Sequence, residues 1–326
     1  MIQQRSIQMY SGKKAMREAF GDALEELGKR NEKVVVLTAD LTDAIKVTKF
    51  KNSFPDRFFQ MGIKESDMIG TAAGMAVDGL IPFATTFAVF ATSLANQPVR
   101  VSVGYNRANV KIATSHGGVC VGADGATHQS FEDVALMRLI PGMTVFVPCD
   151  ANEAYKATFA AADIDGPVYL RLGRVPTQVV TAPETEFIPG KAVVMREGRD
   201  CAVIAMGAMV SAAMEAAAVL ESEGVRIGVI NMHTIKPLDR EAVLDAASRC
   251  GCIVTAEEHT VIGGLGSACA EVLALESPVP MRMVGVQDTF GESGEPEEIM
   301  KKYHLTSADI AENVRLVLAK KNRRDG

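Results

Sequence analysis

The chain has 326 residues, of which 48% are hydrophobic and 23% charged, and its formal net charge is −6. This length suits two domains, and the composition is that of an ordinary globular protein. A nucleic-acid-binding protein usually carries a basic face, and no stretch here supplies one. The N-terminal stretch MIQQRSIQMYSGKK lacks the apolar core of a signal peptide, and no run of about 18 apolar residues follows. We therefore expect a cytoplasmic protein that binds neither nucleic acid nor membrane.

The first half of the chain alternates between helical and strand-like patterns. Residues 13–29 have apolar side chains at helical spacing, and residues 34–40 form a short apolar run typical of a strand buried on both faces. Further helices are expected over 68–79, 131–142 and 152–164, and strands over 81–92 (strand or strand-to-helix), 110–117, 144–150 and 168–173. This alternation predicts a doubly wound α/β domain over residues 1–180.

The pattern breaks over residues 176–199, which contain three prolines and have mixed polarity. We interpret residues 181–198 as a linker and residues 199–326 as a second α/β domain. The six cysteines lie mostly in or beside apolar runs, which favours reduced, small core residues. The pair Cys250 and Cys252 is only a weak signal for a metal site.

The loop SHGGVCVGADGATHQ, residues 115–129, follows a predicted strand. Ligands of such sheets bind beyond the carboxyl ends of the strands, and glycines let the backbone come close to a ligand. His116, Asp124 and His128 suit recognition of hydroxyl and carbonyl groups and proton transfer. A zinc site fits the spacing poorly, and a purely structural loop is the remaining alternative. His128 also precedes Ser130-Phe-Glu-Asp133, which resembles a capping box at a helix start.

Three further features each have two interpretations. Glu65, in GIKESDMIG, is either a partly desolvated functional carboxylate or a helix-capping acid. Phe83, Phe87 and Phe90 are either core residues or an aromatic wall for a flat heterocycle. In the second half, residues 263–266 (GGLG) form only an incomplete dinucleotide fingerprint, and residues 257–259 (EEH) favour a turn at a subunit contact.

Three motifs together resemble the transketolase family. They are GIKESDMIGTAAGMA, TTFAVF and SHGGVCVGADGATHQ, and the likeness to the C-terminal half of a transketolase covers nearly the whole chain. It implies two doubly wound domains, a thiamine diphosphate pyrimidine-binding domain followed by a transketolase C-terminal domain. It also implies thiamine diphosphate chemistry, in which the cofactor serves as the electron sink for a carbanion.

The resemblance implies roles for particular residues. Glu65 matches the glutamate that hydrogen-bonds the aminopyrimidine ring, and Phe87 and Phe90 match the aromatic residues packed on that ring. The other matches are Asp40 near the cofactor, His116, Asp124 and His128 at the substrate hydroxyls and carbonyl, and Arg174 at the sugar phosphate.

The phosphate site departs from the family pattern. The second phosphate-binding arginine matches a position near Lys13, which keeps a charge but lacks the bidentate fork of arginine. The phosphate-binding serine is replaced by Ala44, and an aromatic residue by Ser93. We therefore expect Lys13 at a phosphate site tuned to a different acceptor.

The largest departure is a missing motif. The family binds metal and diphosphate through G-D-G followed by N-N, and this sequence contains no such motif. We therefore expect the small C-terminal subunit of a split transketolase, which transfers a two-carbon ketol group between sugar phosphates. An N-terminal subunit would supply Mg²⁺ and diphosphate binding in an α2β2 assembly. The alternatives are the E1 beta subunit of a 2-oxo acid dehydrogenase, a deoxyxylulose-phosphate synthase-like enzyme, and a catalytically silent binding subunit.

Overall fold

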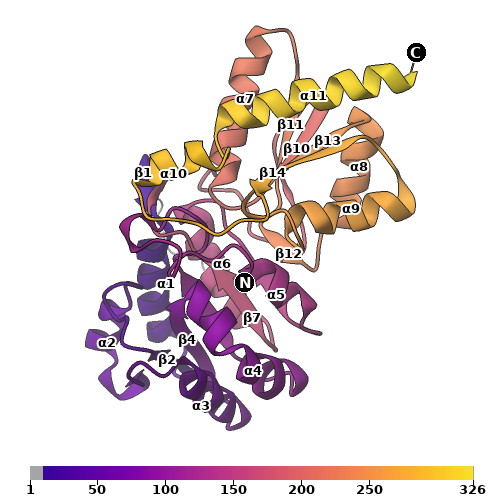
Figure 1. The fold of residues 1–326 in the computed structure, drawn as a ribbon. Coiled ribbons are helices and arrows are strands. Elements are labelled where there is room, and N and C mark those ends of the chain that lie inside the picture. The colour runs from indigo at the N-terminus through magenta and orange to yellow at the C-terminus, as the bar shows by residue number, and fades with distance from the viewer. Residues whose placement is uncertain (1–9, 326) are drawn as a thin grey trace.

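The computed structural model describes residues 10–325, and within this range the chain forms two α/β domains stacked end to end (Figure 1). Each domain has a mostly parallel sheet covered by helices on both faces. A short antiparallel pair, β1 (Lys13–Ala15) and β8 (Pro176–Gln178), lies apart from both sheets. The expected fold class, two doubly wound domains, is confirmed.

The first sheet is parallel except for one edge strand. Its order is β12 (Thr234–Lys236), β6 (Thr144–Phe146), β7 (Val168–Arg171), β5 (Lys111–Ser115), β4 (Ile81–Phe87), β2 (Val34–Thr38) and β3 (Phe58–Gln60). The associated helices are α1 (Met16–Arg30), α2 (Thr48–Ser53), α3 (Glu65–Val77), α4 (Asn96–Pro98), α5 (Asp133–Leu139) and α6 (Ala151–Asp163), with short turns η1 (Pro55–Arg57), η2 (Phe90–Leu94), η3 (Val99–Tyr105) and η4 (Gly122–Asp124).

Strand β2 illustrates why its sequence is apolar throughout. Val34 and Val36 point into the core beneath α1 and α6, whereas Val35 and Leu37 point into the opposite core beneath α3. Successive side chains of a strand alternate between faces, so a strand covered on both sides needs an unbroken apolar run.

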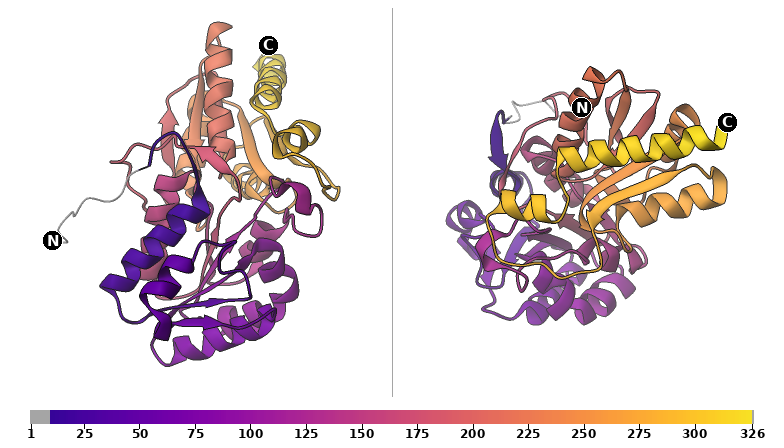
Figure 2. Two further views of the ribbon diagram at one scale, coloured as in Figure 1. Left: turned by 90° about the vertical axis from the view of Figure 1, so that its left-hand side faces the viewer. Right: turned by 45° about the horizontal axis from the view of Figure 1, so that its top comes forward.

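The second sheet has the order β14 (Met281–Val286), β13 (Ile253–Thr260), β10 (Cys201–Ala205), β11 (Ile227–Asn231) and β9 (Val193–Arg196). One face is covered by α7 (Met209–Ser222) and α11 (Ser307–Asp325), which lie side by side in Figure 2, and the other by α8 (Arg240–Cys250) and α9 (Leu265–Glu276). Helix α10 (Pro296–Lys302) follows a segment that crosses between the domains in Figure 1.

The connection between the domains contains more structure than the sequence predicts. Residues 193–196, within the expected linker, form the antiparallel edge strand β9 of the second sheet. Strand β12, from the second half of the chain, pairs antiparallel with β6 of the first sheet. Edge strands are covered less completely than central ones, so they carry mixed polarity and escape a search for apolar runs. The domain limits 1–180, 181–198 and 199–326 otherwise stay a prediction.

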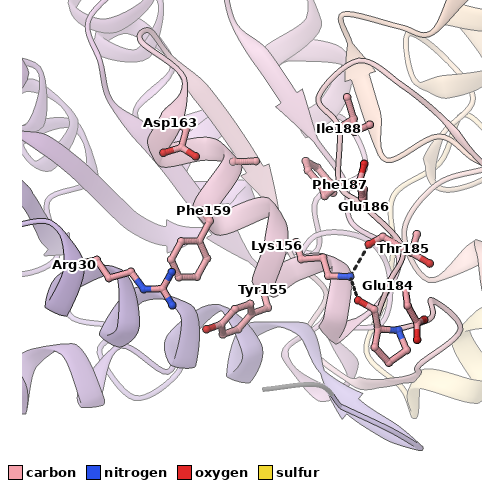
Figure 3. Close-up of a pocket in the computed structure, with 12 residues that line it drawn as sticks. Arg30, Tyr155, Lys156, Phe159, Asp163, Glu184, Thr185, Glu186, Phe187 and Ile188 are labelled. Atoms are coloured by element: carbon pink, nitrogen blue, oxygen red, sulfur yellow. Dashed lines mark hydrogen bonds between the residues drawn. The ribbon is translucent and has the colours of Figure 1, made fainter. Parts of the chain in front are cut away.

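The remaining connector wraps around α6. Figure 3 shows a cavity of about 450 Å³ between this helix and residues 183–188, with Lys156 at its edge. The Lys156 ammonium group donates to the carbonyl oxygens of Pro183 (2.9 Å) and Thr185 (2.5 Å). The lining includes none of the predicted site residues, so we regard this cavity as part of the domain connection.

Other expectations concern the whole chain. All six cysteines are buried and free, as expected for core residues. Among residues 10–325, no helix is both long and apolar enough to cross a membrane, and no group of three or more His, Cys, Asp or Glu side chains is placed to hold a metal ion. Most of the N-terminal stretch that lacks a signal-peptide core, residues 1–9, lies outside the described range.

Candidate active site

The predicted site residues gather at the carboxyl edge of the first sheet. Strand β4 ends at Phe87, β5 ends at Ser115 directly before His116, and β7 ends at Arg171 three residues before Arg174. These strands are neighbours in the order β7-β5-β4. Because parallel strands bring their carboxyl ends to one edge, residues distant in sequence meet there.

Four aromatic rings form the centre of the site. His116 stacks on Phe87, with ring centroids 3.7 Å apart and an interplanar angle of 27°. Phe90 stacks on Phe87 at 5.7 Å, and the edge of His128 meets Phe90 at 5.4 Å. The structure thus brings together both predicted histidines and both predicted ring-packing phenylalanines. Phe83, by contrast, is fully buried against Phe20 and belongs to the core.

The backbone at His116 has an unusual conformation. Its φ is +62°, a left-handed value that costs energy for a residue with a side chain and is often found at functional sites. The ring is buried, and burial lowers the pKa of His116 to about 3, with the positive charges of Arg17 and Arg174 lowering it further. His116 is therefore a neutral imidazole at physiological pH, able to donate and accept a hydrogen bond.

Each histidine is oriented by the hydroxyl of the preceding residue. The Nδ1 atom of His116 lies 2.8 Å from Ser115 Oγ, and that of His128 lies 2.9 Å from Thr127 Oγ1. Within the described part of the chain, neither Nε2 atom has a hydrogen-bond partner. The arrangement leaves Nε2 of both rings available to a ligand.

Two arginines lie beside the histidines, and only Arg174 was predicted. Arg174 donates from Nη1 to the Val121 carbonyl oxygen in the glycine-rich loop. Arg17, on the first turn of α1, donates from Nη1 to Ala44 O (2.6 Å), while its buried Nε has no partner among the described residues. Burial lowers the pKa of Arg17, and the charge of Arg174 lowers it further. Two partly desolvated guanidinium groups at one site suit a phosphate or carboxylate.

Arg17 was missed because helical periodicity hides it. It follows an apolar stretch at a helix start and resembles an ordinary surface charge. Its distance of four residues from Lys13, the position matched to the second phosphate-binding arginine, is the signal that could have found it. The structure makes Arg17 a better candidate for that position than Lys13, which is exposed on β1.

Two other predicted residues stand apart from the ring cluster. Asp124 is exposed in the turn η4, in the middle of the glycine-rich loop. Asp40 is exposed just beyond β2 with φ +59°, and its backbone N–H donates to Gln60 Oε1 (2.8 Å). No contact with the histidines or phenylalanines is present for either side chain in the described range.

One local prediction about the loop is wrong. Ser130 does not cap a helix, because α5 begins at Asp133 after Glu132 and its start has no side-chain cap. The Asp133 carboxylate instead accepts from Tyr169 and Arg171, both at 2.7 Å. This buried ion pair prevents Asp133 from serving the helix start, and His128 lies five residues before α5 rather than at its N-terminus.

Glu65 is the first residue of α3, and its side chain is only 5% exposed. No hydrogen-bond or ion-pair partner for its carboxylate exists within residues 10–325, so the helix-capping interpretation does not hold. The neighbouring Ser66 hydroxyl donates to Leu94 O (2.7 Å) and thereby ties the start of α3 to η2, the turn that begins at Phe90. A buried carboxylate without a partner is costly unless another molecule supplies one.

These residues fit the pyrimidine end of a thiamine cofactor. A polar heterocycle would satisfy the unpartnered Glu65 carboxylate, and Phe87 and Phe90 offer aromatic faces to such a ring. In the described range, no cluster of acidic residues could hold the Mg²⁺ that a diphosphate needs. This chain therefore fits one end of the cofactor.

The GGLG stretch does not offer an anion site. The helix α9 begins there, and the Glu257 carboxylate accepts from the N–H groups of Leu265 and Gly266, both at 2.7 Å. The helix N-terminus is thus occupied by the protein's own anion, which excludes a phosphate at the same place. Glu257 and His259 are buried within the chain, which also argues against a turn at a subunit contact.

Comparison with known proteins identifies this architecture. Residues 12–178 match the transketolase pyrimidine-binding domain, and residues 190–310 match the transketolase C-terminal domain. The fold and site are thus those of the C-terminal half of a thiamine diphosphate-dependent enzyme. The chain belongs to the transketolase family, and this family implies dependence on thiamine diphosphate.

Similar proteins include subunits of divided enzymes. The chain is 43% identical to the 6-deoxy-6-sulfo-D-fructose transketolase subunit SqwH of Clostridium sp. (strain MSTE9), over 95% of this chain and 96% of that protein. It is 37% identical to a subunit of the apulose-4-phosphate transketolase of Phocaeicola vulgatus, over 91% and 95%. A solved structure described as a split gene transketolase, inactive beta4 tetramer, is 49% identical with a TM-score of 0.89, and the match covers 94% of this chain and 99% of that one.

Proposed function

We propose that this chain is the C-terminal subunit of a split transketolase, which transfers a two-carbon ketol group between phosphorylated sugars. The observation that carries the proposal is the contrast within the site. The substrate-facing histidines have oriented rings, whereas the buried Glu65 carboxylate has no partner in the described chain. The similarity to transketolase subunits of nearly equal length supports the same conclusion.

In this proposal the cofactor, when bound, supplies a nucleophilic carbon and an electron sink. Glu65 holds a hydrogen bond to its pyrimidine ring, Phe87 and Phe90 pack against that ring, and Asp40 lies near it. His116 and His128 bind the substrate carbonyl and hydroxyls through Nε2 and move protons at those oxygens. Their neutral form suits this task because one ring nitrogen can accept while the other donates.

The sugar phosphate is assigned to the two arginines. Arg174 and Arg17 provide paired guanidinium groups, and Asp124 contacts a hydroxyl group from the exposed part of the loop. Lys13 contributes charge at the rim, because it is exposed on the strand that leads into α1. Ala44 offers only its backbone carbonyl, which is already bonded to Arg17, so the phosphate depends more on the arginines.

The missing half of the site is assigned to another subunit. An N-terminal transketolase chain would bring the Mg²⁺ ligands and diphosphate-binding groups and would close over Glu65. Exposed apolar residues flank Glu65, with Ile63 78% and Leu94 60% exposed, as expected of a surface that a partner covers. Self-association of this chain would give α2β2.

The test is co-expression with the candidate N-terminal subunit, followed by assays with thiamine diphosphate and Mg²⁺. We expect ketol transfer between sugar phosphates. A stable complex that decarboxylates pyruvate but acts on no ketose phosphate would replace this proposal with the E1 beta alternative. Condensation of pyruvate with an aldose phosphate would favour the deoxyxylulose-phosphate synthase-like alternative, and a saturated but inert complex the silent binding subunit. The similar proteins support these alternatives less well.

A further inference from the structure

The glycine-rich loop of the first domain is held by a carboxylate from the second domain. Glu258, near the end of β13, is 5% exposed, and its Oε1 accepts a hydrogen bond from the backbone N–H of Cys120 at 2.8 Å. A buried charge of this kind is stabilised by the donors around it, and the loop supplies such a donor. The loop is thus anchored by a residue 138 positions further along the chain.

The contact is too close to be incidental. A Cβ atom at Gly118, which has φ +95°, would lie 2.3 Å from Glu258 Oε1. The Gly118 N–H donates to Ser130 O (2.9 Å) and closes the base of the loop. The glycine at this position therefore serves to admit the Glu258 carboxylate, in addition to permitting the backbone turn.

Arg171 extends the anchor to the residue next to His116. Its side chain lies directly below Gly117, where an added Cβ would be 2.6 Å from Nε. Arg171 Nη2 donates to the Glu258 carbonyl oxygen at 2.9 Å, and Nε donates to the Asp133 carboxylate at 2.7 Å. The backbone immediately after His116 is therefore packed on a buried group that the second domain helps to orient.

A second contact fixes the far end of the loop. The Gln129 side-chain amide donates to Val119 O (2.9 Å) within the loop and to Glu292 O (3.0 Å) in the segment between β14 and α10. The loop is thus held by the second domain on both sides of the residues that bear the substrate-facing groups.

We propose that Glu258 is a positioning residue, through which the C-terminal domain holds the loop of His116, Asp124 and His128 in its substrate-binding conformation. The kinetic part of this inference rests on the proposed function. Without the anchor, the loop occupies the competent conformation for a smaller fraction of time, and apparent substrate affinity falls by that fraction. At saturating substrate the loop is ordered again, so turnover recovers.

The test compares Glu258→Ala with Glu257→Ala in the full chain. Glu257 is an equally buried neighbour that caps α9 and does not contact the loop, so its variant controls for general destabilisation. We expect E258A to speed amide hydrogen exchange at Val119 and Cys120 by about 10- to 100-fold, and E257A to leave it unchanged. Glu258→Gln keeps an oxygen acceptor and should restore most of the protection.

The kinetic readout uses the complex with the N-terminal subunit. E258A should raise KM for the sugar phosphates about 10- to 100-fold with kcat nearly unchanged. A loss of folded protein would instead lower kcat at constant KM, and that result, or unchanged exchange, overturns the proposal. If E258A does not fold, Glu258→Asp carries the same test, because its shorter side chain withdraws the carboxylate from Cys120. If the wild-type complex transfers no ketol group, the proposed function fails, while hydrogen exchange still decides the role of Glu258.

Discussion

The two ends of the candidate site differ in how far this chain completes them. At the substrate end, both histidines are oriented by hydroxyl groups and two arginines stand beside them. At the cofactor end, Glu65 is buried without a partner in the described chain and is flanked by the exposed Ile63 and Leu94. The contrast indicates a chain that prepares its substrate-binding groups by itself and leaves its cofactor-binding carboxylate to be satisfied on assembly.

The largest effect is expected at the incomplete end. Glu65→Gln preserves size but removes the charge, so it should slow ketol transfer by the assembled enzyme by about 100-fold or more, the range of a lost acid–base group. Thermal unfolding of the chain alone should change little, because no partner within the described residues is lost. Unchanged turnover would refute the role assigned to Glu65.

The next effect separates arginine from lysine at the complete end. Arg17→Gln and Arg174→Gln should each raise KM for a phosphorylated substrate about 10-fold or more, because charge-assisted hydrogen bonds are lost. Lys13→Gln is the matched control and should change KM by less than about twofold, since an exposed charge contributes little. Steady-state assays with phosphorylated and unphosphorylated acceptors would measure this. If K13Q matched the arginine variants, the assignment of Arg17 would be wrong.

A smaller effect concerns stability and pH. The folded-state pKa of His116 is about 3 against 6.5 for the free side chain, so the unfolded chain binds the extra proton between these values. Stability from this group is complete above pH 6.5 and is lost as the pH falls towards 3. Relative to His116→Asn, the wild type should lose about 2 kcal/mol between pH 7.5 and 5.

The difference between the two proteins must be measured, because other groups act in the opposite direction. Burial raises the pKa of both Glu153 and Glu257 to about 7, and such carboxyls favour folding as the pH falls from 7 to 4.5. Asparagine tolerates the positive φ of position 116, so the variant does not add backbone strain. Parallel urea titrations of wild type and variant would cancel the contribution of the glutamates, and identical pH profiles would contradict the buried, neutral His116.

Most of the fold could be predicted because central parallel strands such as β2 and β10 are apolar throughout and helices such as α1 and α6 keep a strict period. The edge strands β9 and β12 could not, since their residues face less core. Within the site, strand ends located Phe87 and His116 correctly. Arg17 was missed and Ser130 misread, because both depend on long-range contacts with Ala44, Arg174 and Asp133 that local patterns do not contain.

The most direct test of the central claim is a titration of this chain with the N-terminal subunit while ketol transfer is measured. With thiamine diphosphate and Mg²⁺ present, we predict no turnover by this chain alone and a linear rise in activity that ends at equal amounts of the two chains. Full turnover by this chain without the partner would contradict the account.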